Sequence, residues 1–364
     1  MEINHEEPQL NNCENLPSQK IAKEIGEMLI NVPEIENLSE LETPFGLITR
    51  LSKNPHNPNI SPDYTNKKNV FAGLTDQGPT VIIHFSEEIY GQDQDYFKRL
   101  YENCKYVYSN DAVPGAKITP KLLGFDDKSM TILLEKAPHD LTKYFESNNT
   151  DEIKNVINKL ISFIQKLWIV SQKDSKELCR YVDNFLKPEY DFLQDKKIDS
   201  YINDPKTLNL YKEIQEKITE YKANVNMKGF KRGFGLSDMK AANVVEDKDG
   251  NILSIDVEKF GYCHWLSMLG QFYQDTIKQT PNSQFSDVLK EKILESLSSE
   301  SDVELAKQLF IIGRMNRLLI PITLRNIVFA DEINEPVQES EIFDCLQEIN
   351  KLIKANSLGE VMEK

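Results

Sequence analysis

A change in hydrophobic periodicity near residue 138 constrains the fold more than any other feature of the sequence. Before this point the apolar runs are short and separated by turn residues, which is typical of strands. After it, apolar residues recur at intervals of three and four, as one face of a helix requires. One helical segment interrupts the first part, and one hairpin interrupts the second. This order predicts an α+β protein in which a small antiparallel sheet precedes a large helical region.

The strand-rich part is predicted to occupy residues 40–138, after a polar N-terminal segment, residues 1–39, that contains one short helix. Within the strand-rich part, Asp93–Tyr108 carries an apolar stripe at helical spacing, so we expect a helix there. The predicted strands are Phe45–Leu51, Val70–Leu74, Thr80–Phe85, Ile118–Gly124 and Ser129–Glu135.

The helical part is predicted to span residues 139–364, with a hairpin at residues 235–261. Apolar residues at helical spacing from Ile157 to Trp168 mark its first helix, which we expect to form the core of this part. The other predicted helices are Tyr181–Leu193, Lys206–Tyr221, Gln271–Ile277, Phe285–Leu297, Val303–Phe329 and Glu341–Lys354.

The balance of charge excludes some classes of partner. The chain has 364 residues, with 43 Lys and Arg against 58 Asp and Glu, and its net charge is −15. A protein that binds nucleic acid needs a basic surface to displace counterions, so we expect no nucleic-acid partner. No apolar run reaches the roughly 20 residues that span a bilayer, so we expect no membrane span.

The ends of the chain and its cysteines bear on its compartment. The start, MEINHEEPQL, is acidic and polar where a secretory signal would be basic and then apolar. The five cysteines are odd in number and lack a C-x-x-C pair, so we expect reduced thiols and no zinc site. These features predict a cytoplasmic protein. The acidic tail is interpreted as solvated surface; the alternative is the secretion signal of a bacterial effector that acts in a host cytosol.

The hairpin segment carries the strongest chemical signal. Asp238 and Asn243 lie at the two ends of the loop DMKAAN, and Asp256 closes the apolar run that follows. A turn at Asp249-Gly250 would fold this stretch into a hairpin and bring Asn243 and Asp256 to the same end. Two oxygen ligands beside a carboxylate suit Mg²⁺-assisted phosphoryl transfer, because the metal takes oxygen donors and the attacking hydroxyl needs a proton acceptor. The alternative is an acidic hairpin whose Asp and Asn side chains form turns and caps.

The whole stretch resembles the protein-kinase-like superfamily. SDMKAANVV is similar to the catalytic loop of Ser/Thr protein kinases, and IDVEKFGY is similar to the matching segment of choline kinases and aminoglycoside phosphotransferases. The resemblance implies a two-lobe fold, with a small antiparallel-sheet N-lobe and a large helical C-lobe, that uses ATP and Mg²⁺. It implies that Asp238 accepts the proton of the substrate hydroxyl and that Lys240 steadies the γ-phosphate. Asn243 and Asp256 would hold Mg²⁺, and Glu258 would either add an oxygen ligand or form a surface salt bridge.

The resemblance also assigns residues to the nucleotide in the strand-rich part. Aligning TVIIHF with the third strand of the family places His84 where a Lys or Arg contacts the α and β phosphates. Glu102 then has the spacing of the helix glutamate that orients this cation, and Glu87 and Glu88 compete for that role. A neutral histidine is a poorer phosphate anchor, so an ordinary strand residue is the alternative for His84.

Other residues could compensate for the missing strand cation. The loop before Val70 lacks the glycines that let backbone amides approach phosphate, and Lys67 or Lys68 could take over the contact. The segment EKAPHDL falls where kinase-like folds place the hinge between their lobes, so the resemblance assigns its Glu135 to the nucleotide.

Two residues near the loop depart from the family pattern. Leu236 stands where the family generally has a histidine that packs under the loop, and Met268 stands where an aspartate normally braces it. Both changes remove hydrogen-bonding groups that orient the residues in contact with substrate. Either the loop is braced differently or the site is not fully assembled in the resting protein.

A small basic cluster precedes the loop. Lys228, Lys231 and Arg232 concentrate positive charge in an acidic chain. One interpretation is an ordinary surface patch. The other is a site for a polyanion, such as a phosphorylated substrate or an inositol-phosphate-like effector whose binding would order the loop.

These observations predict an ATP- and Mg²⁺-dependent phosphotransferase that acts on a hydroxyl group of a protein or a small molecule. Lys240 favours an atypical protein Ser/Thr kinase. The long helical insertion before Asp238 and the absence of an A-P-E tripeptide favour the alternative, a kinase of aminoglycoside-like or choline-like small molecules. A third possibility is a pseudokinase, a binding module without turnover, because His84, Leu236 and Met268 depart from the family.

Overall fold

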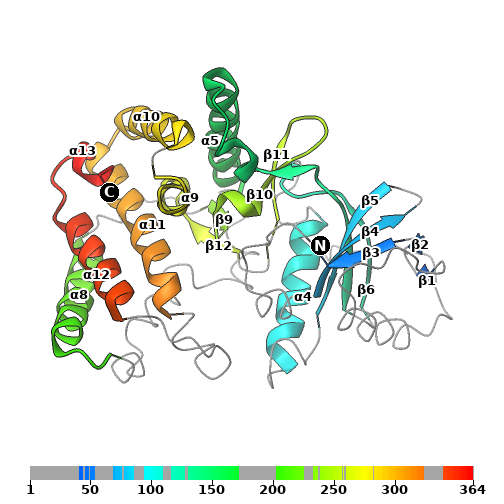
Figure 1. The fold of residues 1–364 in the computed structure, drawn as a ribbon, viewed down its shortest axis with the longest axis horizontal. Helices are drawn as coiled ribbons and strands as arrows, with labels where there is room; N and C mark the ends of the chain where they lie inside the picture. Colours follow the sequence, from blue (N-terminus) through cyan, green and yellow to red (C-terminus); the bar gives the residue numbers. More distant parts are fainter. Residues whose placement is uncertain are drawn as a thin grey trace, which may run out of the picture. The chain divides into compact units, whose positions relative to one another are not determined.

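The computed structural model describes residues 41–43, 46–48, 50–53, 69–75, 78–85, 94–109, 116–127, 130–171, 202–224, 233–236, 238–255, 257, 260–281, 283–323 and 339–363. These residues form two compact units. The first contains the described residues up to Ser109 together with Pro120–Lys136, and the second contains residues 116–119 and those from Ala137 onward. Figure 1 shows the elements of both units.

A five-stranded antiparallel sheet forms the centre of the first unit, in the order β3-β4-β5-β7-β6. β4 and β5 pair from Asn69 and His84 to Thr75 and Gly78, so the predicted strands Val70–Leu74 and Thr80–Phe85 are antiparallel neighbours. The strands are β3 (Arg50–Lys53), β4 (Asn69–Thr75), β5 (Gly78–His84), β6 (Leu122–Asp126) and β7 (Thr131–Glu135), beside a separate ribbon of β1 (Leu41–Thr43) and β2 (Gly46–Ile48).

Strand β6 begins later than the sequence predicted. We expected a strand at Ile118–Gly124, but the Ile118 carbonyl belongs to the second unit, where it accepts a hydrogen bond from the Ser254 amide at 2.8 Å. Pro120 has no amide proton to donate to a sheet, so the ladder starts only beyond it, at Leu122.

Helix α4 (Gln94–Tyr108) is the only helix among the described residues of the first unit, and it confirms the predicted helix. Its predicted apolar stripe is buried at Leu100, Cys104 and Val107. On the same helix, the Tyr101 hydroxyl and the Lys105 ammonium both donate to Oδ1 of Asp127, at 2.6 and 2.7 Å. These two bonds fix α4 to the end of β6.

The second unit is mainly helical, and the predicted α+β class is confirmed. The core stripe predicted from Ile157 onward is buried along α5, with Ile157, Leu160 and Ile164 fully inaccessible to solvent. None of the helices among the described residues has the length and apolar character that a bilayer crossing requires. The helices are α5 (Thr150–Ser171), α8 (Pro205–Asn224), α9 (Trp265–Gln279), α10 (Gln284–Ser298), α11 (Val303–Thr323), α12 (Glu339–Lys354) and α13 (Leu358–Val361), with short 3-10 turns η1 (Leu141–Tyr144) and η3 (Ala241–Asn243).

The predicted helices of this unit are confirmed wherever the structure describes them. The predicted helix Tyr181–Leu193 lies outside the described residues, as does the end of Val303–Phe329 beyond Thr323. The predicted hairpin is also confirmed, because β10 (Val244–Glu246) pairs antiparallel with β11 (Ile252–Ser254). At its turn Gly250 has φ of 76°, a left-handed conformation that glycine adopts without strain.

The hairpin gains a third strand that the sequence did not predict. β8 (His139–Asp140) pairs antiparallel with β10, through Val245 opposite Asp140. Two residues are too few to show an alternation of apolar and polar side chains, so a strand of this length leaves no sequence pattern.

Helices α9 and α11 lie side by side in the second unit (Figure 1) and approach each other closely through two glycines. A β-carbon on Gly270 would lie 2.3 Å from the Phe310 carbonyl oxygen, and one on Gly313 would lie 1.9 Å from the Ser267 carbonyl oxygen. Real β-carbons do not come this close to backbone atoms. Only glycine therefore permits this helix separation at both positions.

We predict that Gly313→Ala destabilises the protein by roughly 2–3 kcal/mol, because overpacking against backbone outweighs the roughly 1 kcal/mol by which Ala favours a helix. Urea denaturation measures the change in the free energy of unfolding. Gly359→Ala in α13 is the matched control, since a β-carbon there would meet only the Ser357 hydroxyl, at 3.8 Å. Equal stability of both variants and the wild type would contradict the prediction.

Candidate active site

A pair of short strands brackets the predicted catalytic loop. β9 (Gly233–Leu236) and β12 (Phe260–Cys263) pair antiparallel, with Gly235 opposite Gly261. This pairing was not predicted from the sequence, because each strand has only four residues. The pairing joins the two ends of the segment that carries Asp238 and the hairpin, so the backbone is held in place on both sides of this segment.

The loop itself is held from inside. Met239 and Ala241 are completely buried. The turn η3 ends at Asn243, whose backbone amide donates a hydrogen bond to the Lys240 carbonyl at 2.9 Å. Buried and partly exposed residues alternate along the loop. Asp238 is one of the partly exposed residues, and its side chain is 27% exposed. A partly exposed carboxylate on a fixed backbone is suited to contact a bound molecule.

Asn243 orients Asp238 by two hydrogen bonds. Its Nδ2 donates to the Asp238 carbonyl oxygen and to Oδ2 of the Asp238 side chain, both at 3.0 Å. Asn243 is 6% exposed, so it is a well-anchored donor. The two residues that the sequence analysis placed at the ends of the loop are therefore in direct contact.

Lys240 binds the same oxygen of Asp238. Its Nζ lies 2.9 Å from Oδ2, and the Lys240 side chain is 26% exposed. An ion pair with this exposure contributes little net stability, because water competes for both charges. Lys240 is therefore a donor that can leave Asp238 at a small cost in free energy.

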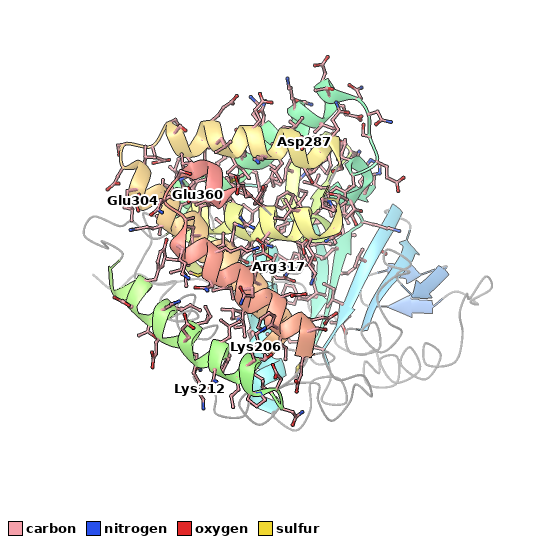
Figure 2. All side chains as sticks on the ribbon, turned by 60° about the vertical axis from the view of Figure 1, so that its left-hand side comes forward. Lys206, Lys212, Asp287, Glu304, Arg317 and Glu360 are labelled. Atoms are coloured by element: carbon pink, nitrogen blue, oxygen red, sulfur yellow. The ribbon has the colours of Figure 1, made fainter. Side chains whose placement is uncertain are left out.

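A third donor reaches Asp238 from helix α11. Arg317 Nη1 donates to Oδ1 of Asp238 at 2.6 Å, while its Nε and Nη2 donate to Oδ1 of Asp275 on α9, with the Nε bond at 3.0 Å. The Asp275 side chain is only 5% exposed. Figure 2 shows Arg317 on α11 within the helical unit. The other charged residues labelled there are exposed, namely Lys206, Lys212, Asp287, Glu304 and Glu360.

Arg317 is locked in its charged form. Burial alone would lower the pKa of its guanidinium, but the negative charges of Asp275 and Asp238 outweigh burial and raise this pKa above its usual value. Neither Arg317 nor Asp275 was among the site residues predicted from the sequence. A signal was present, because an arginine within the apolar run of α11 must find a partner when that helix is buried.

The two residues that depart from the family pattern contact each other. The Leu236 amide donates to the Met268 sulfur at 3.4 Å, and both side chains are buried. A thioether is a weak acceptor. Arg317, which is bound to Asp275, provides a charged contact to Asp238 in addition to this weak bond.

The remaining predicted site residues lie in the first unit or outside the described residues. His84 ends β5, opposite Asn69 and Thr131, and Glu102 is exposed on α4. Glu135 ends β7, and its amide donates to the Lys121 carbonyl at 2.9 Å. Outside the described residues lie Lys67, Lys68, Glu87, Glu88, Lys228, Lys231, Arg232, Asp256 and Glu258.

The described part of the site fits a magnesium ion in its chemistry. The Asn243 side chain has two polar atoms. Nδ2 donates a hydrogen bond to Asp238, and Oδ1 is an oxygen ligand of the kind that Mg²⁺ takes. The described residues contain no group of three or more His, Cys, Asp or Glu side chains that could hold a metal. The other two predicted ligands, Asp256 and Glu258, are not among the described residues.

His264 anchors the start of α9, the helix that carries Asp275. Its Nδ1 accepts a hydrogen bond from the Leu266 amide at 3.2 Å, which caps the helix. Its ring packs on Trp168, with the ring centroids 4.5 Å apart. Burial lowers the pKa of His264 from its usual 6.5 to about 4. The cap therefore works with a neutral imidazole.

We predict that acidification destabilises the protein through His264. Between pH 6.5 and about 4 the unfolded chain binds a proton at this residue and the folded chain does not, so stability falls as pH falls through this window. Between pH 7.5 and pH 5 the loss is about 2 kcal/mol. Urea denaturation of the wild type and of His264→Asn, which keeps a capping side chain that does not titrate, measures the difference. The same pH dependence in both proteins would refute the assignment.

Kinases of small molecules are among the solved structures with a similar fold. The choline kinase LicA from Streptococcus pneumoniae is 14% identical, with a TM-score of 0.51 over 92% of this chain and 98% of that one. The aminoglycoside phosphotransferase APH(4)-Ia is 11% identical, with a TM-score of 0.55 over 93% and 99%. The amicoumacin kinase hAmiN, in complex with AMP-PNP, Ca²⁺ and Ami, is 9% identical, with a TM-score of 0.54 over 80% and 86%. No protein-family model and no curated protein matches the sequence.

Proposed function

Because the chain has the protein-kinase-like fold, we propose that it transfers the γ-phosphoryl group of ATP to a hydroxyl group of a small molecule. A fold hosts many activities, so the proposal depends on the site. The observation that carries it is the contact between Asp238 and Asn243 on one fixed loop. This contact combines a partly exposed carboxylate with an oxygen donor for a metal ion.

Asp238 supplies the base in this proposal. As the acceptor oxygen attacks the γ-phosphorus, its proton passes to the Asp238 carboxylate, and the bond from phosphorus to the bridging oxygen of ADP breaks. General bases of this kind contribute about 10²- to 10⁴-fold to the rate. Asn243 keeps the carboxylate in the orientation that this transfer requires.

Asn243 would hold Mg²⁺ together with Asp256, and Glu258 is a further candidate ligand. When bound, the ion neutralises the charge on the phosphates of ATP. Lys240 would steady the γ-phosphate after leaving Asp238. Because Lys240 is partly exposed, breaking its ion pair with Asp238 costs little free energy. His84, Glu102, Lys67, Lys68 and Glu135 remain proposals for the nucleotide, carried by the family resemblance.

The comparisons favour a small-molecule acceptor over the protein Ser/Thr kinase that the sequence analysis preferred. That preference depended on Lys240, which in this structure forms an ion pair with Asp238. The helical insertion before the loop, of which the structure describes α8, supports the same choice. None of the comparisons supports the inositol-phosphate-like effector considered for the basic cluster at residues 228–232.

A binding module without turnover is the second candidate. The observation in its favour is that both side-chain oxygens of Asp238 are engaged within the protein. Oδ1 accepts a hydrogen bond from Arg317, and Oδ2 accepts one from Asn243 and forms an ion pair with Lys240. Such a module would bind ATP without using it. Turnover assays separate the two candidates.

We predict that Asp238→Asn lowers phosphate transfer by about 10²- to 10⁴-fold and leaves the ATP-dependent rise in melting temperature in place. The assay follows labelled ATP in the presence of choline, an aminoglycoside or a generic protein acceptor. Asp287→Asn, an exposed carboxylate on α10, is the control and should have wild-type activity.

Three results would contradict parts of the proposal. Label on the protein acceptor alone would restore the protein-kinase interpretation. An unchanged rate in Asp238→Asn would remove the proposed base. A melting shift with ATP and no transfer to any acceptor would favour the binding module.

A further inference from the structure

Asp238 lies on a loop and is held by a cation from helix α11, Arg317, and neither the fold nor the proposed function accounts for this contact. We propose that Arg317 is a positioning residue for Asp238, that Asp275 holds Arg317 in place, and that Oδ2 of Asp238 is the oxygen that meets the acceptor. The inference rests on the proposed function, because it concerns the orientation of the base in that reaction.

The two oxygens of Asp238 differ in how firmly they are held. Oδ1 accepts from Arg317 Nη1 at 2.6 Å, and the Arg317 side chain is 17% exposed. Oδ2 accepts from the buried Asn243 and from Lys240, which is 26% exposed. Of Arg317, Asn243 and Lys240, Lys240 is the most exposed, so it is the donor that an acceptor hydroxyl would displace most readily from Oδ2. Oδ1 stays bonded to Arg317.

Arg317 is itself anchored on its other side. Its Nε and Nη2 both donate to Oδ1 of Asp275, and Oδ2 of Asp275 accepts from Gln279 Nε2 at 2.6 Å. The guanidinium is planar and presents its donors in a fixed fork. Binding Asp275 by one edge therefore fixes the direction in which Nη1 points, which is toward Asp238.

A second arginine on the same helix, Arg314, is fully buried and shows that burial alone does not require this contact. Arg314 lies one turn earlier on α11, and its Nε donates to Gln274 of α9 at 2.6 Å. Its other donors bind Glu348 and the Val361 carbonyl. Arg314 thus joins helices and the C-terminal segment, whereas Arg317 alone of the two contacts the catalytic loop.

The decisive variant removes both charges of the anchor together. Arg317→Met alone would leave Asp275 buried without its cation and could prevent folding, whereas Arg317→Met/Asp275→Leu replaces the pair by apolar side chains, an exchange that proteins often tolerate. We expect this double variant to melt near the wild-type temperature and to show the same melting shift with ATP. Its kcat should fall about 10- to 100-fold with KM for the acceptor little changed, because the base is present but misaligned.

Conservative and matched variants separate positioning from general damage. Arg317→Lys keeps the charge but loses the fork, so its kcat should lie between those of the wild type and the double variant. Lys307→Met, on the same helix, removes an ion pair with Glu304 and should leave kcat and KM unchanged. Wild-type kcat in the double variant, or a loss that appears in KM alone, would overturn the inference.

A measurement of stability tests the contact without relying on turnover. Asp238→Ala is introduced into the wild type and into the double variant, and the shift in urea midpoint is compared between the two backgrounds. We expect different shifts, because Asp238 has Arg317 as a partner only in the wild type. Equal shifts would overturn the inference whatever the activity. If the shifts differ and no acceptor is phosphorylated by the wild type, the proposed function fails and the constraint on Asp238 is upheld.

Discussion

The close contact of α9 and α11 at Gly270 and Gly313 is the constraint on which the candidate site depends. With no side chains between them, the two helices approach until a β-carbon at either position would meet backbone oxygen. Polar side chains on the two helices can then form hydrogen bonds from one helix to the other, as Arg317 does with Asp275. A larger separation would move the guanidinium away from Asp238. The orientation of the loop is therefore set by helix packing as well as by the loop itself.

Because the ion pair between Arg317 and Asp275 is largely shielded from water, the fold is sensitive to substitution of either residue. A buried arginine and aspartate stabilise the fold only while both are present, since removing one partner leaves a charge in a medium of low polarity. Asp275 is 5% exposed, so it depends on Arg317 more than Asp238 does. At the other end of α9, His264 must stay neutral to accept a hydrogen bond from the Leu266 amide. Charge state and packing are linked at both ends of the helix that supports the site.

Much of the fold could be predicted from the sequence, because its elements have long or distinctive patterns. The stripes of α4 and α5 extend over several turns, and Gly250 marks the hairpin by its left-handed backbone. The strands β8, β9 and β12 were missed, because two to four residues show no periodicity and their partners are distant in sequence. For the same reason the sequence placed Asp238 and Asn243 on one loop but did not find Arg317, whose partners lie on other elements.

The brace by Arg317 changes how the departures at Leu236 and Met268 should be understood. The resemblance to the kinase-like superfamily leads us to expect an aspartate at position 268. The Met268 sulfur found there gives the Leu236 amide only a weak bond. The structure supplies a carboxylate at Asp275, on the same helix, and connects it to the loop through a guanidinium. A cation that bridges two carboxylates makes stronger, charge-assisted hydrogen bonds than the thioether does. The departures at Leu236 and Met268 are therefore a weak argument against activity, because Asp238, the proposed base, keeps a defined orientation through Arg317 and Asn243.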